Sequence, residues 1–205
     1  MLRRRIKRVL GPSLWLRLKD LFYRPSGVAM GPRSYIFSPR TINQPHTLTL
    51  GERCEILAGS YIWTLESGMI WKREGGTPQV RIGDGTYIGR HLFLTAIHSV
   101  SIGKHCVLSD YVYITDHAHG LDPQGGFTLH QPLESKGPVE IGDNCFIGFR
   151  AAILPGVTLG AHCVVGVNSV VTRSFPAYTM VAGSPARAIK TYSHELNQWV
   201  AVSQP

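Results

Sequence analysis

The sequence predicts an all-β fold in which short extended segments wind into stacked, flat-sided coils. Three observations carry this prediction, and the first two are that an aliphatic residue recurs every six residues and that a small or apolar residue follows it four positions later. A third is the content of 22 glycines and 13 prolines among 205 residues, which is typical of a chain with many turns. A six-residue period suits a flat side of about four extended residues, with alternate side chains pointing inward, followed by a two-residue corner.

The aliphatic position is often followed by glycine. These pairs are Leu50-Gly51, Ile82-Gly83, Ile88-Gly89, Ile102-Gly103, Ile141-Gly142, Ile147-Gly148, Leu159-Gly160 and Val165-Gly166. Three such sides make one coil, and successive coils would stack as parallel strands. The repeat therefore predicts about five coils, at residues 50–67, 82–99, 102–119, 141–158 and 159–176. The second and third coils begin twenty residues apart, so two extra residues are expected to bulge near Ile97–Val100.

The cysteines share one position of the repeat. All four of them, Cys54, Cys106, Cys145 and Cys163, stand four residues after an aliphatic residue, where the side chain should point inward. No two of them form a CxxC pair. The pattern predicts small buried apolar side chains rather than disulfides, metal ligands or nucleophiles.

Basic charge is concentrated in a predicted N-terminal arm, residues 1–34. Residues 1–24 contain eight Lys or Arg and one acid, Asp20, and their apolar residues share one face of an amphipathic helix. Such a helix can lie on anionic lipid, and the alternative is packing on the coils or on a neighbouring subunit. Because the remaining chain is nearly neutral, no nucleic-acid partner is expected.

The other segments define the expected organisation. A repeat domain is predicted at residues 35–176, with a loop insertion at 120–138, and residues 177–205 form a cap and tail. A loop of that length inside a compact domain is usually either functional or disordered, and its start directly after the dense His cluster at 117 and 119 favours function. The sequence has no run of eighteen apolar residues and no secretory signal. A cytoplasmic location is therefore expected, with the basic arm allowing peripheral contact at the inner face of the membrane.

The chain resembles the hexapeptide-repeat acyltransferases. The resemblance is carried by the repeats, by the stretch TDHAHG at 115–120, and by the run from Pro138 to Lys190. The segment QPLESKGPVEIGDN, residues 131–144, is similar to the surface-polysaccharide branch, the colanic-acid and lipopolysaccharide O-acetyltransferases. The resemblance implies a left-handed parallel β-helix, acetyl-CoA as donor without a metal, and a homotrimer with active sites between adjacent subunits.

The resemblance places the catalytic base on His117, where the chain leaves a coil for the long loop. Acyl transfer from a thioester to a hydroxyl needs a base that works near neutral pH, and histidine suits this role. His119 is the alternative base or a group that orients the acceptor. Asp116 could orient an imidazole or bind sugar hydroxyls, but alternation along a continuing strand would place it on the face opposite to His117.

The resemblance also assigns a set of residues to the acetyl-CoA donor. They are Phe146, Gly148, Phe149, Val167, Thr172, Arg173, Arg187 and Lys190. Phe146 stands where the family commonly has Trp, and Phe149 stands where a small residue is usual. Arg187 and Lys190 would meet the CoA phosphates, because Arg and Lys are the natural partners of phosphate.

The predicted function is transfer of an acetyl group from acetyl-CoA to a sugar hydroxyl of a surface polysaccharide or its lipid-linked precursor, in a ternary complex. His91, His98, Tyr113 and the loop 120–138 are candidate acceptor contacts. One alternative is an N-acetyltransferase that acts on an amino-sugar. Others are a zinc protein like the γ-type carbonic anhydrases, using His91, His117 and His119, and a non-catalytic β-helix subunit.

Overall fold

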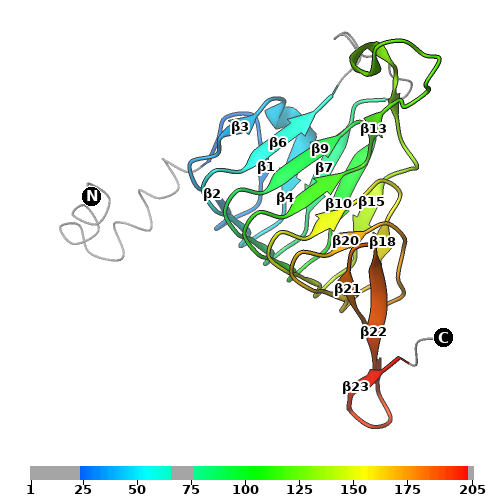
Figure 1. Cartoon of the computed structure of the whole chain (residues 1–205). Helices are drawn as coiled ribbons and strands as arrows, with labels where there is room; N and C mark the ends of the chain where they lie inside the picture. Colours follow the sequence, from blue (N-terminus) through cyan, green and yellow to red (C-terminus); the bar gives the residue numbers. More distant parts are fainter. Residues whose placement is uncertain (1–23, 66–75, 203–205) are drawn as a thin grey trace.

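The computed structural model describes residues 24–65 and 76–202. These residues form short strands and two 3-10 helices, η1 (Pro45–Thr47) and η2 (Thr128–His130), with no α-helix among them. The amphipathic helix expected within residues 1–24 falls on residues outside this described part, apart from Arg24. The strands wind into a three-sided β-helix whose coils stack side by side (Figure 1). No helix within the described residues is long and apolar enough to cross a membrane.

Three sheets form the sides of the β-helix. Sheet A contains β1 (Ala29–Met30), β4 (Leu48–Leu50), β7 (Gln79–Ile82), β10 (Ser99–Ile102), β15 (Val139–Ile141) and β18 (Thr158–Leu159). Sheet B contains β2 (Tyr35–Ile36), β5 (Glu55–Ile56), β8 (Tyr87–Ile88), β11 (Val107–Leu108), β16 (Phe146–Ile147), β19 (Val164–Val165), β21 (Thr179–Gly183), β22 (Ala186–Ser193) and β23 (Gln198–Ala201). Sheet C contains β3 (Thr41–Ile42), β6 (Tyr61–Thr64), β9 (Phe93–Ala96), β12 (Tyr113–Thr115), β17 (Ala152–Ile153) and β20 (Val170–Val171).

The core follows from the six-residue period. In sheet B the aliphatic residue of each coil pairs in parallel register with its equivalent in the next, as Ile88 does with Leu108 and Leu108 with Ile147. All three side chains are fully buried. Stacking like on like along the axis gives the coils one continuous apolar interior.

The corners turn through left-handed backbone. The residue three positions after an aliphatic residue has a positive φ at many corners, as at His105 (55°), Asn144 (56°) and His162 (59°). Gly85 takes the same place with a φ of 67°. The left-handed region is accessible to Asn and His at modest cost and to glycine at none, so these four corner residues match the geometry.

The described residues contain one coil more than the repeat count predicted. Strands β1, β2 and β3 form a coil before Leu48 and pair in parallel with β4, β5 and β6. Met30, Ile36 and Ile42 continue the six-residue period there. The spacing from Ile42 to Leu50 is eight residues because η1 intervenes, and this break hid the first coil.

Beyond the last coil, β21 continues sheet B in parallel with β19. Strands β22 and β23 then turn back as an antiparallel hairpin that extends away from the coils (Figure 1). The segment expected to be a cap and tail therefore contains regular strands. Its ladder of hydrogen bonds leaves β23 as the edge strand of sheet B.

The four cysteines are buried free thiols, as their place in the repeat predicted. Each Sγ donates to a carbonyl oxygen of the adjacent turn of chain, as Cys54 does to Gly83 at 3.1 Å and Cys106 to Gly142 at 3.1 Å. Burial raises the pKa of Cys54 above its ordinary value. This group therefore remains a protonated, unreactive thiol at neutral pH.

We expect the native protein to show no reaction of any of its four cysteines with Ellman's reagent at neutral pH. All four should react once the protein is unfolded in guanidinium chloride, because only unfolding opens the interior of the coils. The absorbance of the released thiolate measures both states. Rapid reaction of even one thiol in the native protein would contradict the burial of these side chains.

Candidate active site

The candidate base lies where the chain leaves sheet C. Strand β12 ends at Thr115, and Asp116 and His117 follow it outside any strand. The chain then forms β13 (Ala118–His119), which pairs antiparallel with β14 (Leu133–Glu134) at the far end of the long loop. The two short strands thus hold the ends of the loop together beside His117. His119 lies within β13, opposite Leu133.

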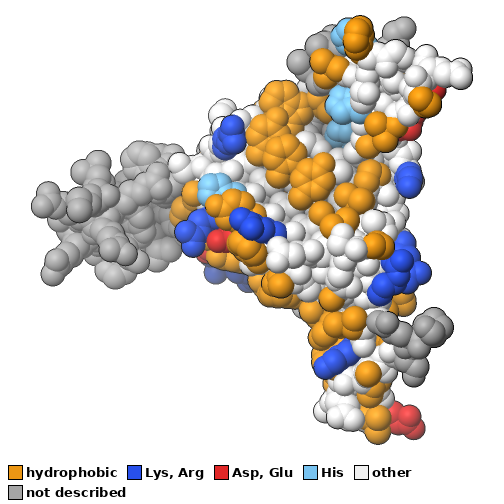
Figure 2. Space-filling model, viewed as in Figure 1, with side chains coloured by type: hydrophobic (Ala, Val, Ile, Leu, Met, Phe, Trp, Pro, Cys, Tyr) orange, Lys and Arg blue, Asp and Glu red, His pale blue; other side chains and the backbone are white. Residues whose placement is uncertain are grey.

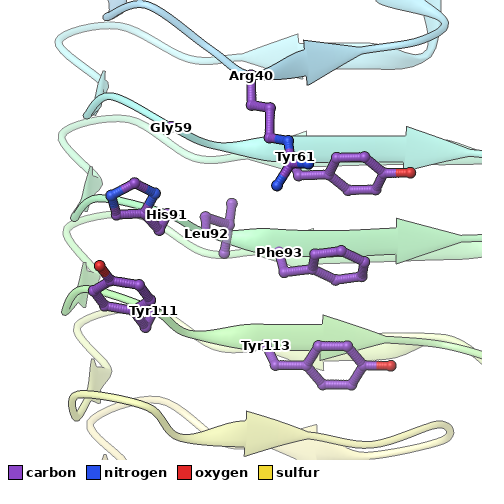
Figure 3. A pocket seen from close by; sticks show the side chains of 8 residues that line it. All are labelled: Arg40, Gly59, Tyr61, His91, Leu92, Phe93, Tyr111 and Tyr113. Atoms are coloured by element: carbon purple, nitrogen blue, oxygen red, sulfur yellow. The ribbon is translucent and has the colours of Figure 1, made fainter.

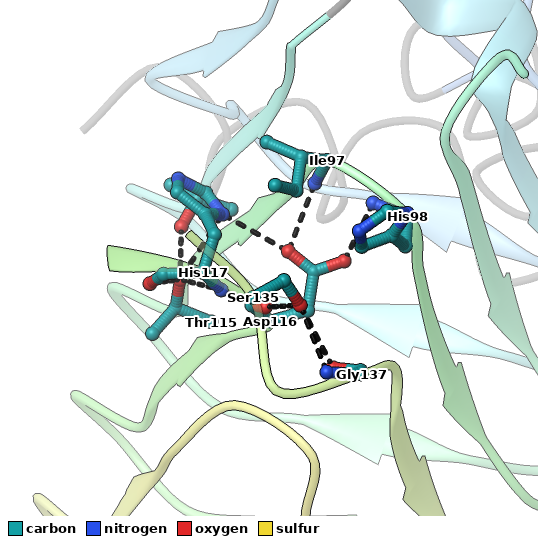
Figure 4. Close-up of polar contacts among 8 residues, drawn as sticks. Ile97, His98, Thr115, Asp116, His117, Ser135 and Gly137 are labelled. Carbon is teal, nitrogen blue, oxygen red and sulfur yellow. Dashed lines mark hydrogen bonds and ion pairs between the residues drawn. The ribbon is translucent and has the colours of Figure 1, made fainter. Parts of the chain in front are cut away.

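Asp116 is completely buried and binds three donors (Figure 4). Its Oδ1 accepts from the backbone N–H of Ile97 at 2.9 Å, and its Oδ2 accepts from that of His98 at 2.7 Å. The same Oδ1 lies 2.9 Å from Nδ1 of His117. The expectation that Asp116 would face away from His117 was wrong. Strand alternation stops at Thr115, so the period of two no longer governs the next side chains.

This contact determines what the imidazole of His117 can do. The side chain of His117 is only 10% exposed, and its Nδ1 faces the carboxylate of Asp116. A carboxylate that accepts from Nδ1–H holds the proton on that nitrogen and leaves Nε2 as the proton acceptor. The pair therefore has the arrangement of a general base oriented by a buried acid.

Further hydroxyl groups fix the segment around this pair. Thr95 donates from Oγ1 to Oγ1 of Thr115 at 2.9 Å, and Thr115 donates to the carbonyl of His117 at 3.0 Å. The Ser135 hydroxyl donates to the carbonyl of Asp116 and accepts from the backbone N–H of Gly137 at 3.0 Å. The returning end of the long loop is therefore tied to the residue that precedes His117.

Sequence reasoning missed Thr95, Thr115 and Ser135. It did contain a signal for the backbone of Ile97 and His98, because the two-residue excess between coils falls there. These residues leave the strand pattern after β9, and their N–H groups point at Asp116 instead of joining a ladder. Ser135 had no such signal, since only the folded loop brings it to Asp116.

The predicted donor residues occupy several parts of the surface. Phe146 lies on the outer face of sheet B and is 44% exposed, between Val107 and Val164 of the adjoining coils. Gly148 and Phe149 follow at the edge between sheets B and C, where Phe149 packs edge-on against Tyr111 with ring centroids 5.7 Å apart. Val167 lies on the same edge and is exposed.

The remaining donor candidates lie nearer the end of the chain. Thr172 and Arg173 follow β20 at the edge between sheets C and A, the edge that also carries His117. The register places Thr172 two coils from Thr115, about 10 Å along the axis. Arg187 and Lys190 lie on β22. Within one copy of the chain, His117 therefore contacts Asp116, whereas Phe146 lies on a different side of the β-helix.

A groove lies on the outer face of sheet C (Figure 3). One wall is an aromatic ladder, Tyr61, Phe93 and Tyr113, in which successive rings stack with centroids 4.6 and 5.5 Å apart. The other wall is the edge between sheets B and C, where His91 stacks on Tyr111. The groove encloses about 430 Å³ and Arg40 also lines it. Figure 2 shows an apolar stripe on this side of the molecule, next to histidine side chains.

The histidines proposed for a zinc site are not arranged as a set. His91 belongs to the groove wall and stacks on Tyr111 with ring centroids 4.7 Å apart, whereas His117 binds Asp116. Within residues 24–65 and 76–202, no three His, Cys, Asp or Glu side chains are grouped so that they could hold a metal ion.

Comparison with known proteins decides the family. Residues 138–173 match the family model described as the hexapeptide repeat of succinyl-transferase. The chain belongs to the hexapeptide-repeat acyltransferases. The fold of this hexapeptide-repeat protein is the left-handed parallel β-helix that the resemblance implied.

Two sequence relatives are acetyltransferases by name, both names being provisional. The chain is 36% identical over 131 residues to WbbJ of Escherichia coli K12, which is named as a lipopolysaccharide biosynthesis O-acetyl transferase. This alignment covers 60% of this chain and 66% of WbbJ. It is 32% identical over 162 residues to acetyltransferase Rv3034c of Mycobacterium tuberculosis, covering 71% of this chain and 52% of the relative. The match therefore spans about half to two thirds of these relatives.

Solved structures share the fold at low sequence identity. A point mutant of AntD, an N-acyltransferase from Bacillus cereus in complex with dTDP and coenzyme A, superposes with a TM-score of 0.66 at 17% identity. That superposition covers 85% of this chain and 92% of AntD. Galactoside acetyltransferase in complex with coenzyme A gives a TM-score of 0.53 at 22% identity, covering 78% and 66% of the two chains.

Proposed function

We propose that this protein is an acetyl-CoA-dependent O-acetyltransferase that acts on a sugar hydroxyl of a surface polysaccharide or its precursor. The observation that carries the proposal is the buried contact of 2.9 Å between Asp116 and Nδ1 of His117. Support for the acceptor class comes from WbbJ, which is named for lipopolysaccharide O-acetylation.

The proposed reaction needs one base and no covalent enzyme intermediate. The acceptor hydroxyl oxygen attacks the carbonyl carbon of the thioester, and its proton passes to Nε2 of His117. The carbon–sulfur bond then breaks, and the CoA sulfur takes the proton from the imidazolium. Asp116 stabilises the imidazolium that forms between these steps, because its carboxylate faces Nδ1.

The proposal includes a homotrimer whose active sites lie between subunits. Phe146, the candidate donor contact, lies on sheet B, while His117 lies beyond the end of sheet C. A second copy can bring its own Phe146 to the first copy's His117. Sheet B offers an apolar strip for such a contact, because Tyr87, Val107 and Phe146 are each about two fifths exposed.

Two measurements on the full chain test the proposal. Calorimetry should detect acetyl-CoA binding, and thiol release should appear only when a sugar with a free hydroxyl is added. Absence of acetyl-CoA binding would refute the acyltransferase assignment. Turnover confined to amino-sugars would replace O-acetylation with the second candidate function, N-acetylation of an amino-sugar. AntD is named as an N-acyltransferase.

A further inference from the structure

The groove on sheet C has a charge that the transfer reaction itself does not require. Arg40 lines the groove, and the guanidinium of Arg150 lies 5.8 Å from the ring centroid of Tyr111 on the opposite wall. None of the residues that line the groove is an Asp or Glu. Asp110, which directly precedes Tyr111 in the chain, forms an ion pair with Arg90 at 3.4 Å. Among the described residues that line the groove, Arg40 thus carries the one formal charge, and it stands between mostly apolar walls.

Arg40 also acts on the phenol of Tyr61, as the smaller of two opposing effects. Burial raises the pKa of Tyr61, and the guanidinium of Arg40 opposes that shift. Arg40 therefore lies close enough to the aromatic ladder to act on a charge placed there (Figure 3). An apolar wall that excludes water strengthens the attraction between such a cation and an anion in the groove.

The distance from the groove to His117 limits the size of a shared ligand. Tyr113 lines the groove and stands four residues before His117, a separation of at most about 13 Å, the length of four residues of extended chain. A ligand that presents a hydroxyl to His117 and fills the groove would span up to this distance, which is longer than one sugar ring. The part in the groove must be compatible with both aromatic edges and guanidinium groups.

We propose that this groove binds the phosphate or diphosphate group of a phosphate-linked sugar acceptor, while the sugar reaches His117. The inference rests on the proposed transfer function and adds the class of acceptor. Guanidinium groups hold phosphate oxygens through paired hydrogen bonds, which a neutral polysaccharide would not need. The apolar ladder beside them can pack against a carrier attached to the phosphate, and a neutral terminal sugar would leave Arg40 without a charged partner.

Calorimetry with glucose 1-phosphate, glucose and glucuronate tests the charge preference without acetyl-CoA. Glucose 1-phosphate should bind more tightly than the other two. The Arg40→Gln variant should weaken its binding about tenfold, because a charge-assisted hydrogen bond is lost. Arg33→Gln is the matched control, since Arg33 is an exposed corner residue of the same first coil outside the groove. The Arg33→Gln variant should bind glucose 1-phosphate as tightly as wild type.

The outcomes separate this inference from the proposed function. Equal binding of glucose and glucose 1-phosphate, or equal effects of the two variants, overturns the phosphate site. Tighter binding of glucuronate overturns the phosphate class. A nucleoside diphosphate sugar is then compared with glucose 1-phosphate, and tighter binding of the former supports a nucleotide carrier for the same phosphate site. If glucose 1-phosphate binding depends on Arg40 and no acetyl transfer occurs with any acceptor, the proposed reaction is refuted, while the proposal that the groove binds phosphate is supported.

Discussion

Replacing His117 by alanine is expected to lower kcat at least about a hundredfold, because general-base catalysis of this kind contributes that much or more. Acetyl-CoA binding should be unchanged, since in the proposed mechanism His117 acts on the acceptor. Thiol release with a sugar acceptor measures the first quantity, and calorimetry with acetyl-CoA measures the second. Retention of wild-type kcat would remove His117 from the mechanism.

Two further variants identify the base. His119→Ala tests the alternative base, and a loss equal to that of His117→Ala would make His119 an equal candidate. His105→Ala is the matched control, because His105 is an exposed histidine at the corner between β10 and β11, outside the long loop. The kcat of this variant should equal that of wild type. A comparable loss in all three variants would indicate a general disturbance of the fold rather than loss of a base.

Replacing Asp116 by alanine is expected to lower both stability and kcat. The buried N–H of Ile97 and the N–H of His98 would lose their acceptor, and each buried donor left unpaired costs about 1–3 kcal/mol. A loss of about 2–4 kcal/mol in the free energy of unfolding follows, measured by guanidinium denaturation. The kcat should fall as well, because His117 loses the group that orients it.

Asp116→Asn separates the two effects. The amide keeps one oxygen acceptor, so the stability loss should be smaller than for alanine, yet the charge that stabilises an imidazolium is gone. We therefore expect kcat to remain low in a variant that folds well. Wild-type kcat in Asp116→Asn would show that the acid serves the fold alone.

Asp84→Ala is the control for stability. Asp84 also accepts a backbone N–H, from Glu52 at 2.9 Å, but it lies on the surface beside Lys104. The Glu52 N–H and Lys104 lower the pKa of Asp84, so its contribution exists above the pKa of the unfolded carboxyl. That contribution is lost as the pH falls through the lower folded value. At pH 7 the effect should be much smaller than that of Asp116→Ala.

The period of six predicted most of the coils because each coil repeats the same inward positions. Ile88, Leu108 and Ile147 could be assigned to one buried column from spacing alone. The prediction lost the first coil where η1 breaks the spacing. Counting repeats therefore works only while each corner has the same length.

The candidate site was predictable only in part. The position of His117 before the long loop was readable, but its contact with Asp116 depends on where β12 ends. Ser135 reaches Asp116 across nineteen residues of loop, and Tyr61 meets Phe93 across an interval longer than one regular coil. Contacts of this kind come from loop path and coil register, and neither is contained in a local pattern.

The edge between sheets C and A has a consequence for how this molecule can change. Helix η1, the bulge at Ile97, and the loop 120–138 all leave the coils at this edge. The other two edges keep the regular turn. Segments of different length can therefore be exchanged at one edge without shifting the pairing of any strand. Because Asp116 and His117 lie at the root of one such segment, evolution or design can re-shape the surface beside them piece by piece while the contact between these two residues stays unchanged.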